Sequence, residues 1–141
     1  MKADLRFVFD TNVIISAALL KTSVPRQALD LARRLGKILM SWPTMAELQE
    51  VFGRKRFDKY ISENERMLFL EALAREATLI DTIETITDCR DPKDNKFLEV
   101  AVDGNAACVV SGDKDLLTLN PFRGIPVLTP RDFLDRHSSS S

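Results

Sequence analysis

Residues 5–12 read Leu5-Arg6-Phe7-Val8-Phe9-Asp10-Thr11-Asn12, a short apolar run that stops at a carboxylate and is followed by turn residues. The same pattern returns in Ala107-Cys108-Val109-Val110-Ser111-Gly112-Asp113. Such runs are typical of parallel strands that are buried on both faces, and ligands bind outside the carboxyl ends of these strands. The two stretches therefore predict an open α/β sheet with Asp10 and Asp113 at one edge, beside a candidate metal site.

Between the two runs, apolar periodicity and end signals alternate helices with strands. We expect helices at residues 13–20, 26–35, 44–52, 66–77 and 91–102 and from residues 114 and 129 onward, and strands at residues 37–41, 78–86, 107–110 and 125–128. The length of 141 residues fits one domain. We assign this domain to residues 1–137 and a polar tail to residues 138–141.

Composition narrows the function classes. The formal net charge of −1 argues against an overall basic coat for nucleic acid, so any phosphate-binding surface must be local. No run of about 18 apolar residues occurs, so we expect no membrane span and a cytoplasmic protein. Cys89 and Cys108 lack metal-ligand spacing, and His137 is the only histidine. Any chemistry must therefore come from carboxylates.

Four acids fall where the predicted sheet would bring carboxylates together, namely Asp10, Glu47, Asp94 and Asp113. A carboxylate at the end of a buried strand costs desolvation free energy unless it is paired or bound. Carboxylates about 4 Å apart repel by roughly 4 kcal/mol per pair at an effective dielectric constant of about 20, and no Lys or Arg in the motifs is an obvious counter-charge. Oxygen-only ligation suits Mg²⁺ or Mn²⁺, ions that activate water and hold phosphoryl oxygens.

Two of these acids have an alternative role as helix caps. Glu47 follows Thr44 by three residues, which is the spacing of a capping box. Asp94 would occupy the third position of a helix that Asp91 caps, where negative charge is favourable in any case. Asp132 stands in the same pattern near the C-terminus with no other catalytic feature beside it.

The turn after the first strand excludes other kinds of site. Residues 11–14 contain no glycine that would let a phosphate approach the backbone closely, and the chain has no Gly-x-Ser-x-Gly motif. Asn12 is either an ordinary turn residue or an orienting partner of Asp10. Ser111 is a candidate hydrogen-bond donor into the site.

Together the motifs resemble the PIN-domain nucleases, most closely the VapC-like toxins of toxin–antitoxin systems. The resemblance runs from residue 7 to about residue 134 and rests on stretches at residues 9–17, 41–51, 91–101, 110–116 and 125–134. One such match would be weak evidence. Five in the right order are specific.

The resemblance implies a parallel sheet of strand order 3-2-1-4-5 with helices on both faces. It also implies one or two Mg²⁺ or Mn²⁺ ions that promote hydrolysis of RNA phosphodiester bonds. Carried over by position, the catalytic and metal-binding acids are Asp10, Glu47, Asp94 and Asp113. Asp115, in the same turn as Asp113, is the candidate fifth ligand. Asp91 competes with Asp94 but fits the helix N-cap better.

Positive charges near the motifs are candidate RNA contacts. Lys93, Lys96 and Lys114 flank the acids and are the better candidates for phosphate contacts. Two further basic groups offer a path for an RNA backbone, namely Arg33, Arg34 and Lys37, and Arg54, Lys55, Arg56 and Lys59. Phe57 and Tyr60 are either stacking groups or ordinary aromatics of a solvated helix face.

We therefore expect a metal-dependent endoribonuclease that is the toxin of a toxin–antitoxin pair, with a small antitoxin protein as partner and a homodimer as its assembly. The apolar stretch at residues 13–20 would serve a dimer contact as well as the core. The alternatives are a PIN-type nuclease in RNA processing, a haloacid-dehalogenase-like phosphatase and a non-catalytic interaction domain. The phosphatase would need an aspartate where Asn12 stands.

Overall fold

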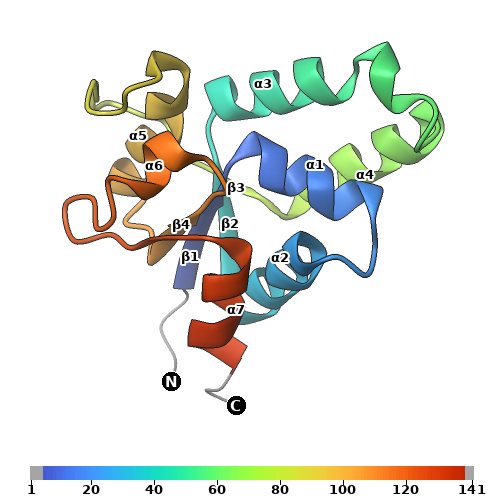
Figure 1. Ribbon diagram of the computed structural model, residues 1–141. Coiled ribbons are helices and arrows are strands. Elements are labelled where there is room, and N and C mark those ends of the chain that lie inside the picture. Colours follow the sequence, from blue (N-terminus) through green and yellow to red (C-terminus); the bar gives the residue numbers. More distant parts are fainter. Residues whose placement is uncertain (1–4, 139–141) are drawn as a thin grey trace.

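The computed structural model describes residues 5–138, in which a parallel sheet lies between helices (Figure 1). Its strands are β1 (Leu5–Phe9), β2 (Gly36–Met40), β3 (Thr78–Leu79), β4 (Cys108–Val110) and β5 (Val127–Leu128). They pair in the order β3-β2-β1-β4-β5, and every pairing is parallel. The predicted order 3-2-1-4-5 is confirmed. Because β1 is central, Asp10 follows it at the middle of the carboxyl edge.

The predicted helices are present, with ends within about one turn of those expected from the sequence. They are α1 (Thr11–Leu19), α2 (Val24–Leu35), α3 (Trp42–Phe52), α4 (Glu63–Glu76), α5 (Asn95–Asp103), α6 (Lys114–Leu117) and α7 (Pro130–His137), with 3-10 turns η1 (Lys55–Phe57) and η2 (Pro92–Asp94). Within residues 5–138, no helix is long and apolar enough to cross a membrane. The predicted tail at residues 138–141 lies outside the described residues except for Ser138, which follows α7.

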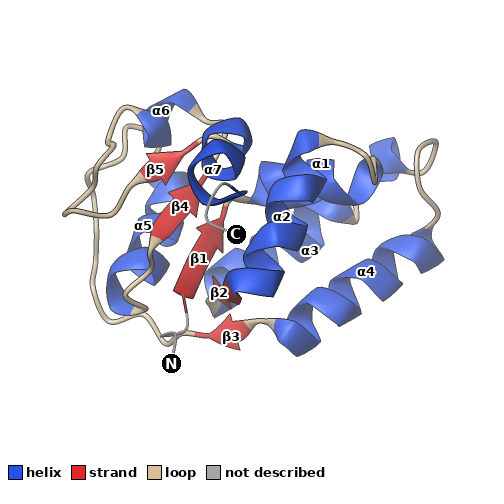
Figure 2. Ribbon diagram, turned by 90° about the horizontal axis from the view of Figure 1, so that it is seen from below, coloured by secondary structure: helices blue, strands red, loops and turns tan. Residues whose placement is uncertain are grey.

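Side chains of β1 alternate between two apolar cores, as expected for a strand that is buried on both faces. Phe7 and Phe9 belong to the core beneath α1, α2 and α7, whereas Val8 belongs to the core beneath α5. The ring of Phe7 meets that of Phe133 edge to face, with 5.3 Å between the ring centroids. Figure 2 shows α2 and α7 on one side of the sheet and α5 on the other, so helices cover both faces as predicted.

The apolar stretch at residues 13–20 packs inward. Val13, Ile14 and Ile15 are at most 5% exposed and belong to the first core. Only Leu20, which follows α1, presents a large exposed side chain, at 59%. This stretch is part of the core and does not provide the surface considered for a dimer contact.

The strand expected at residues 78–86 is wrong beyond Leu79, where β3 ends. The backbone N–H groups of Ile83 and Ile86 donate to the carboxylates of Asp103 and Glu99 on α5, at 2.6 and 3.0 Å. Side chains of α5 thus satisfy backbone donors that a strand would have given to a neighbouring strand.

Gly36 lets β2 begin directly beside β1. A Cβ at this position would lie 1.9 Å from the backbone oxygen of Leu5, which cannot turn away as a side chain can. We expect Gly36→Ala to lower the free energy of unfolding by about 1–3 kcal/mol, measured by urea denaturation. Gly112→Ala is the matched control, because no atom lies within 4 Å of its added Cβ. Its effect should stay within about 0.5 kcal/mol, and equal losses in both variants would contradict this account.

Candidate active site

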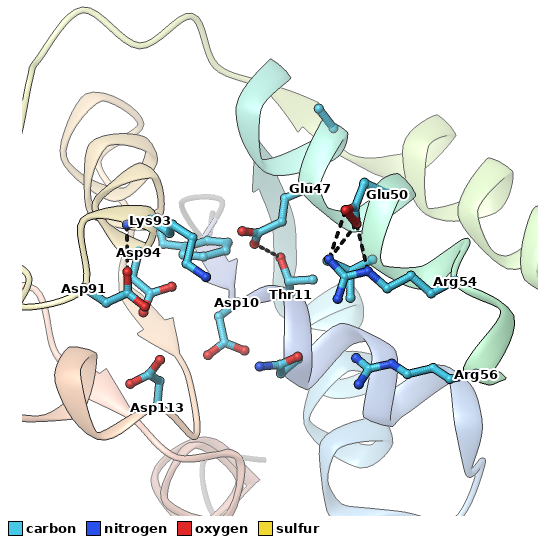
Figure 3. Close-up of a pocket in the computed structure, with 14 residues that line it drawn as sticks. Asp10, Thr11, Glu47, Glu50, Arg54, Arg56, Asp91, Lys93, Asp94 and Asp113 are labelled. Atoms are coloured by element: carbon cyan, nitrogen blue, oxygen red, sulfur yellow. Dashed lines mark hydrogen bonds and ion pairs between the residues drawn. The ribbon is translucent and has the colours of Figure 1, made fainter.

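A pocket of about 610 Å³ opens where β1 and β4 end, at the carboxyl edge of the sheet. Its lining includes all four acids singled out from the sequence, namely Asp10, Glu47, Asp94 and Asp113. Figure 3 shows Asp94 and Asp113 on one side and Asp10 between them and the arginines of the opposite side. The fold thus brings together side chains that lie up to about a hundred residues apart in sequence.

Asp10 is buried, with 5% of its surface exposed. It caps α1, and its Oδ1 accepts a hydrogen bond from the Val13 N–H at 2.9 Å. Its Oδ2 accepts a hydrogen bond from the hydroxyl of Ser111, the donor anticipated from the sequence. Burial raises the pKa of Asp10, and these two hydrogen bonds oppose the rise. The strand-end carboxylate is therefore held in place by both the first helix and the end of β4.

Glu47 does not cap its helix, so the capping reading of this residue is wrong. Ser41 is the N-cap of α3 and forms the capping box with Thr44, which places Glu47 in the second turn. Glu47 Oε1 accepts a hydrogen bond from the Thr11 hydroxyl at 2.5 Å. Because the Glu47 carboxylate does not cap the helix, it is available to line the pocket.

Lys96 is a counter-charge that the sequence did not reveal. Its Nζ lies 2.7 Å from Glu47 Oε2, and both side chains are mostly buried, at 19% and 24% exposed. The expectation that the acids have no lysine or arginine as a counter-charge is therefore wrong for Glu47. Lys96 is absent from the pocket lining, and its predicted phosphate contact competes with this ion pair.

Asp91 and Asp94 compete in the sequence for two roles, the helix cap and the metal-binding acid, and the structure gives them different surroundings. The Asp91 side chain accepts from the Lys93 N–H at 3.1 Å and so caps η2. The Asp94 side chain makes no capping hydrogen bond, and its Oδ2 is buried without any hydrogen-bond partner in the described part of the chain. Burial, and next the nearby Asp113, raise the pKa of Asp94 to about 7.

Asp113 is the N-cap of α6 and lines the acidic side of the pocket. Its Oδ1 accepts a hydrogen bond from the Asp115 N–H at 2.8 Å, and its own N–H donates to Ser111 Oγ at 2.9 Å. Ser111 thus contacts Asp10 and Asp113 together. Asp115 itself is half-buried and does not line the pocket, so its assignment as a ligand has less support than the other four.

Basic residues also line the pocket, and the two arginines among them lie opposite the acids. Arg54, Arg56 and Lys93 belong to the lining, whereas Lys55 and Lys114 are exposed outside it. In Figure 3, Arg54 and Arg56 lie across the pocket from Asp113. The pocket therefore has an acidic side and a basic side.

The other predicted basic group lies elsewhere. Arg33 and Arg34 end α2, and Lys37 begins β2, which places all three at the amino edge of the sheet, away from the pocket. Arg33 also pairs with Glu76 at 2.6 Å. These three residues therefore do not line the pocket, and an RNA path over them remains a prediction. Phe57 is buried in the core, so it is not a stacking group.

Thr11, Asn12, Glu50 and Asp91 also belong to the polar lining of the pocket. Glu50 is a pocket residue that the sequence analysis missed, and it pairs with Arg54 at 2.9 Å. Glu50 precedes Arg54 by four residues, the spacing at which opposite charges pair along a helix, and this spacing could have indicated the ion pair. Asn12 is exposed at the pocket wall and forms no hydrogen bond with Asp10 among those seen in residues 5–138.

The carboxylate oxygens of the pocket fit a hard divalent cation, although they do not converge on a single point. Across residues 5–138, no three Asp, Glu, His or Cys side chains are grouped so as to hold a metal ion in their present positions. Both Asp10 oxygens and Asp113 Oδ1 are engaged by the protein, while Asp94 Oδ2 is buried and unpartnered. Oxygen-only donors and an unsatisfied buried carboxylate oxygen are what Mg²⁺ or Mn²⁺ would require.

Known proteins share this sequence pattern and fold. The family profile described as PIN domain matches residues 6–115. The uncharacterized protein MJ1680 of Methanocaldococcus jannaschii is 31% identical, over 95% of this chain and 92% of that protein. The crystal structure of PAE2754 from Pyrobaculum aerophilum has a TM-score of 0.64 and 13% identity, covering 96% of this chain and 91% of that one. VapBC2 from Rickettsia felis, bound to a promoter DNA fragment, has a TM-score of 0.57 and 17% identity, covering 87% of this chain and 97% of that one.

The raised pKa of Asp94 predicts a pH-dependent stability. A carboxyl group whose pKa is higher in the folded than in the unfolded protein adds stability at low pH, and this is lost as pH rises from about 4 to about 7. In chelator, we expect a lower free energy of unfolding at about pH 7.5 than at about pH 5, measured by urea denaturation. Asp94→Asn should remove most of this difference, whereas Asp91→Asn, which keeps a capping side chain, should reduce it less, because the Asp91 charge makes only a smaller contribution to the raised pKa of Asp94. An unchanged difference in Asp94→Asn would contradict the assignment.

Proposed function

The chain belongs to the PIN-domain family of nucleases, and on that premise we propose that it is a metal-dependent endoribonuclease that hydrolyses RNA phosphodiester bonds. The observation that carries the proposal is the buried, unpartnered Asp94 Oδ2 among the carboxylates of an open pocket. A carboxylate in such a place is costly unless it binds something. A domain that used its acids only to cap helices would leave this oxygen without a role.

The acids have distinct parts in the proposed reaction. Asp10, Asp94 and Asp113 would hold Mg²⁺ or Mn²⁺, and Glu47 would ligate the ion or orient the attacking water. Asp115 is the weaker fifth candidate, since it does not line the pocket. When bound, the ion lowers the pKa of water and stabilises negative charge on phosphoryl oxygens.

Residues beside the acids fix their orientation. The Ser111 hydroxyl and the Val13 N–H hold the two oxygens of Asp10. The Thr11 hydroxyl and Lys96 hold the two oxygens of Glu47. Held in this way at the pocket wall, Glu47 would ligate the ion or orient the attacking water.

The basic side of the pocket would bind phosphates next to the cleaved bond. Arg56 and Lys93 line the pocket, and neither forms an ion pair within the described residues. Arg54, in contrast, forms an ion pair with Glu50. The exposed Lys55 and Lys114 would contact RNA farther from the cleaved bond, and Lys96 would contribute mainly through Glu47.

We also propose that the protein is the toxin of a toxin–antitoxin pair, with a small antitoxin as partner and a homodimer as its assembly. The resemblance to VapC-like toxins supports this, as does the shared fold with VapBC2, which was solved on promoter DNA. A PIN nuclease in RNA processing would use the same pocket, and co-purification with the product of an adjacent reading frame separates the two. The phosphatase alternative lacks its second carboxylate, because Asn12 stands in that place.

Mn²⁺ should raise the thermal unfolding midpoint of the metal-free protein. An ion that binds only the folded state stabilises it by about 2.7 kcal/mol at about 100 times its Kd. Differential scanning calorimetry should show the shift in the wild type and in Asp91→Asn, and a smaller shift in Asp94→Asn. A wild-type midpoint that Mn²⁺ does not move would argue for the non-catalytic interaction domain.

Cleavage itself tests the choice between the two neighbouring acids. With Mn²⁺ and a mixed RNA pool, Asp94→Asn should lose more rate than the roughly 10- to 100-fold that removal of an outer-shell partner costs. Asp91→Asn should stay within a few-fold of the wild type, because Asn caps nearly as well as Asp. Retained cleavage in Asp94→Asn, or loss only in Asp91→Asn, would show that the third acid is wrongly assigned.

A further inference from the structure

A second hollow, which we call the side groove, adjoins the acidic pocket. It has a volume of about 460 Å³ and lies between α1 and the segment at residues 56–60. Asn12 and Arg56 line both the pocket and the side groove. The two spaces therefore meet at these side chains, and a chain-like ligand that reaches the acids can continue into the side groove.

Cations and one exposed ring characterise the side groove. Arg56 and Lys59 line it, and neither forms an ion pair within residues 5–138. Tyr60, also in the lining, is 65% exposed, which is unusual for a large aromatic side chain. Lys59 Nζ lies 5.2 Å from the centroid of that ring. Cations that form no ion pair, beside an accessible ring, are the combination that binds a phosphate and a base.

The segment that carries these residues is anchored to the fold. Arg66, on α4, is 4% exposed and donates hydrogen bonds to the backbone oxygens of Phe52 and Arg54 at 3.0 and 3.1 Å. It also pairs with Asp58 at 2.5 Å. Asp58 lies between the two cations of the side groove in sequence, so the buried guanidinium fixes the backbone on which Arg56, Lys59 and Tyr60 are displayed.

We propose that the side groove is a subsite for one nucleotide of single-stranded RNA, next to the nucleotide whose phosphate meets the acids. Arg56 and Lys59 contact its phosphate, and its base stacks on Tyr60. A duplex cannot use the site in this way, because neighbouring base pairs cover the faces of its bases. The inference rests on the proposed ribonuclease function and adds to it a second binding position for the RNA strand, at Arg56, Lys59 and Tyr60.

The test measures RNA binding without cleavage. A fluorescein-labelled single-stranded RNA of about ten nucleotides is titrated with the protein in chelator, and Kd is read from fluorescence anisotropy. Tyr60→Ala should weaken binding by about 5- to 150-fold, the range expected for the loss of one stacked base. Tyr60→Phe keeps the ring and should stay within about 2-fold of the wild type. Met67→Ala, an exposed change on α4 that lines neither space, is the control for nonspecific effects.

Two further measurements separate stacking from charge. Binding of the matching RNA duplex should not change in Tyr60→Ala. Arg56→Gln should weaken all RNA and reduce the slope of log Kd against log salt by about 0.7, the value for one phosphate contact on a single strand. Thermal midpoints of the variants should match the wild type, because the changed side chains are exposed.

Unchanged single-strand affinity in Tyr60→Ala would overturn the proposal, and so would an equal loss on the duplex. These outcomes are distinct from failure of the proposed function. If the wild type cleaves RNA with Mn²⁺ while Tyr60→Ala binds normally, the subsite is wrong and the nuclease stands. If Tyr60 governs binding but no RNA is cleaved, the subsite stands and the nuclease is wrong.

Discussion

The buried carboxylate of Asp10 is the constraint on which the arrangement of the site depends. Its backbone N–H donates to the Val110 oxygen at 3.0 Å, which ties the end of β1 to β4 and prevents the side chain from moving to solvent. The charge is compensated by the start of α1, where the helix dipole favours an anion, and by the Ser111 hydroxyl. Ser111 Oγ also accepts a hydrogen bond from the Asp113 N–H. The ends of β1 and β4 and the acids Asp10 and Asp113 therefore form one rigid unit.

Around this unit the pocket separates charge. The acids that follow β1 and β4 face arginines from the connection between α3 and α4 (Figure 3). Repulsion among the acids favours a cation on their side, and the opposite side attracts phosphates. In the proposed reaction, a cation held by the acids and the arginines opposite would both attract the negatively charged phosphate. The same arrangement would let a chain of net charge −1 bind the proposed RNA substrate locally.

Local apolar patterns and strand ends predicted the helices, most of the strands and the acids of the pocket, whereas the order of the strands was implied by the resemblance to PIN-domain nucleases. The alternative role of Glu47 in a capping box was wrong, since Trp42-Pro43 starts α3 earlier and makes Ser41 the cap. The sequence missed the Lys96 ion pair, because the partners are 49 residues apart and no local pattern connects them. It also could not tell that Arg33 lies away from the pocket, because charge alone does not show which edge of a sheet a helix end occupies.

The buried Arg66 has a consequence for the thermodynamics of ligand binding. A guanidinium that holds two backbone oxygens and Asp58 shapes the connection after α3 before any ligand arrives. The loss of conformational entropy needed to order that connection is therefore part of folding, and it does not reduce binding affinity. A surface that is preorganised in this way can retain a short, weakly contacting strand that a disordered loop of the same composition would release.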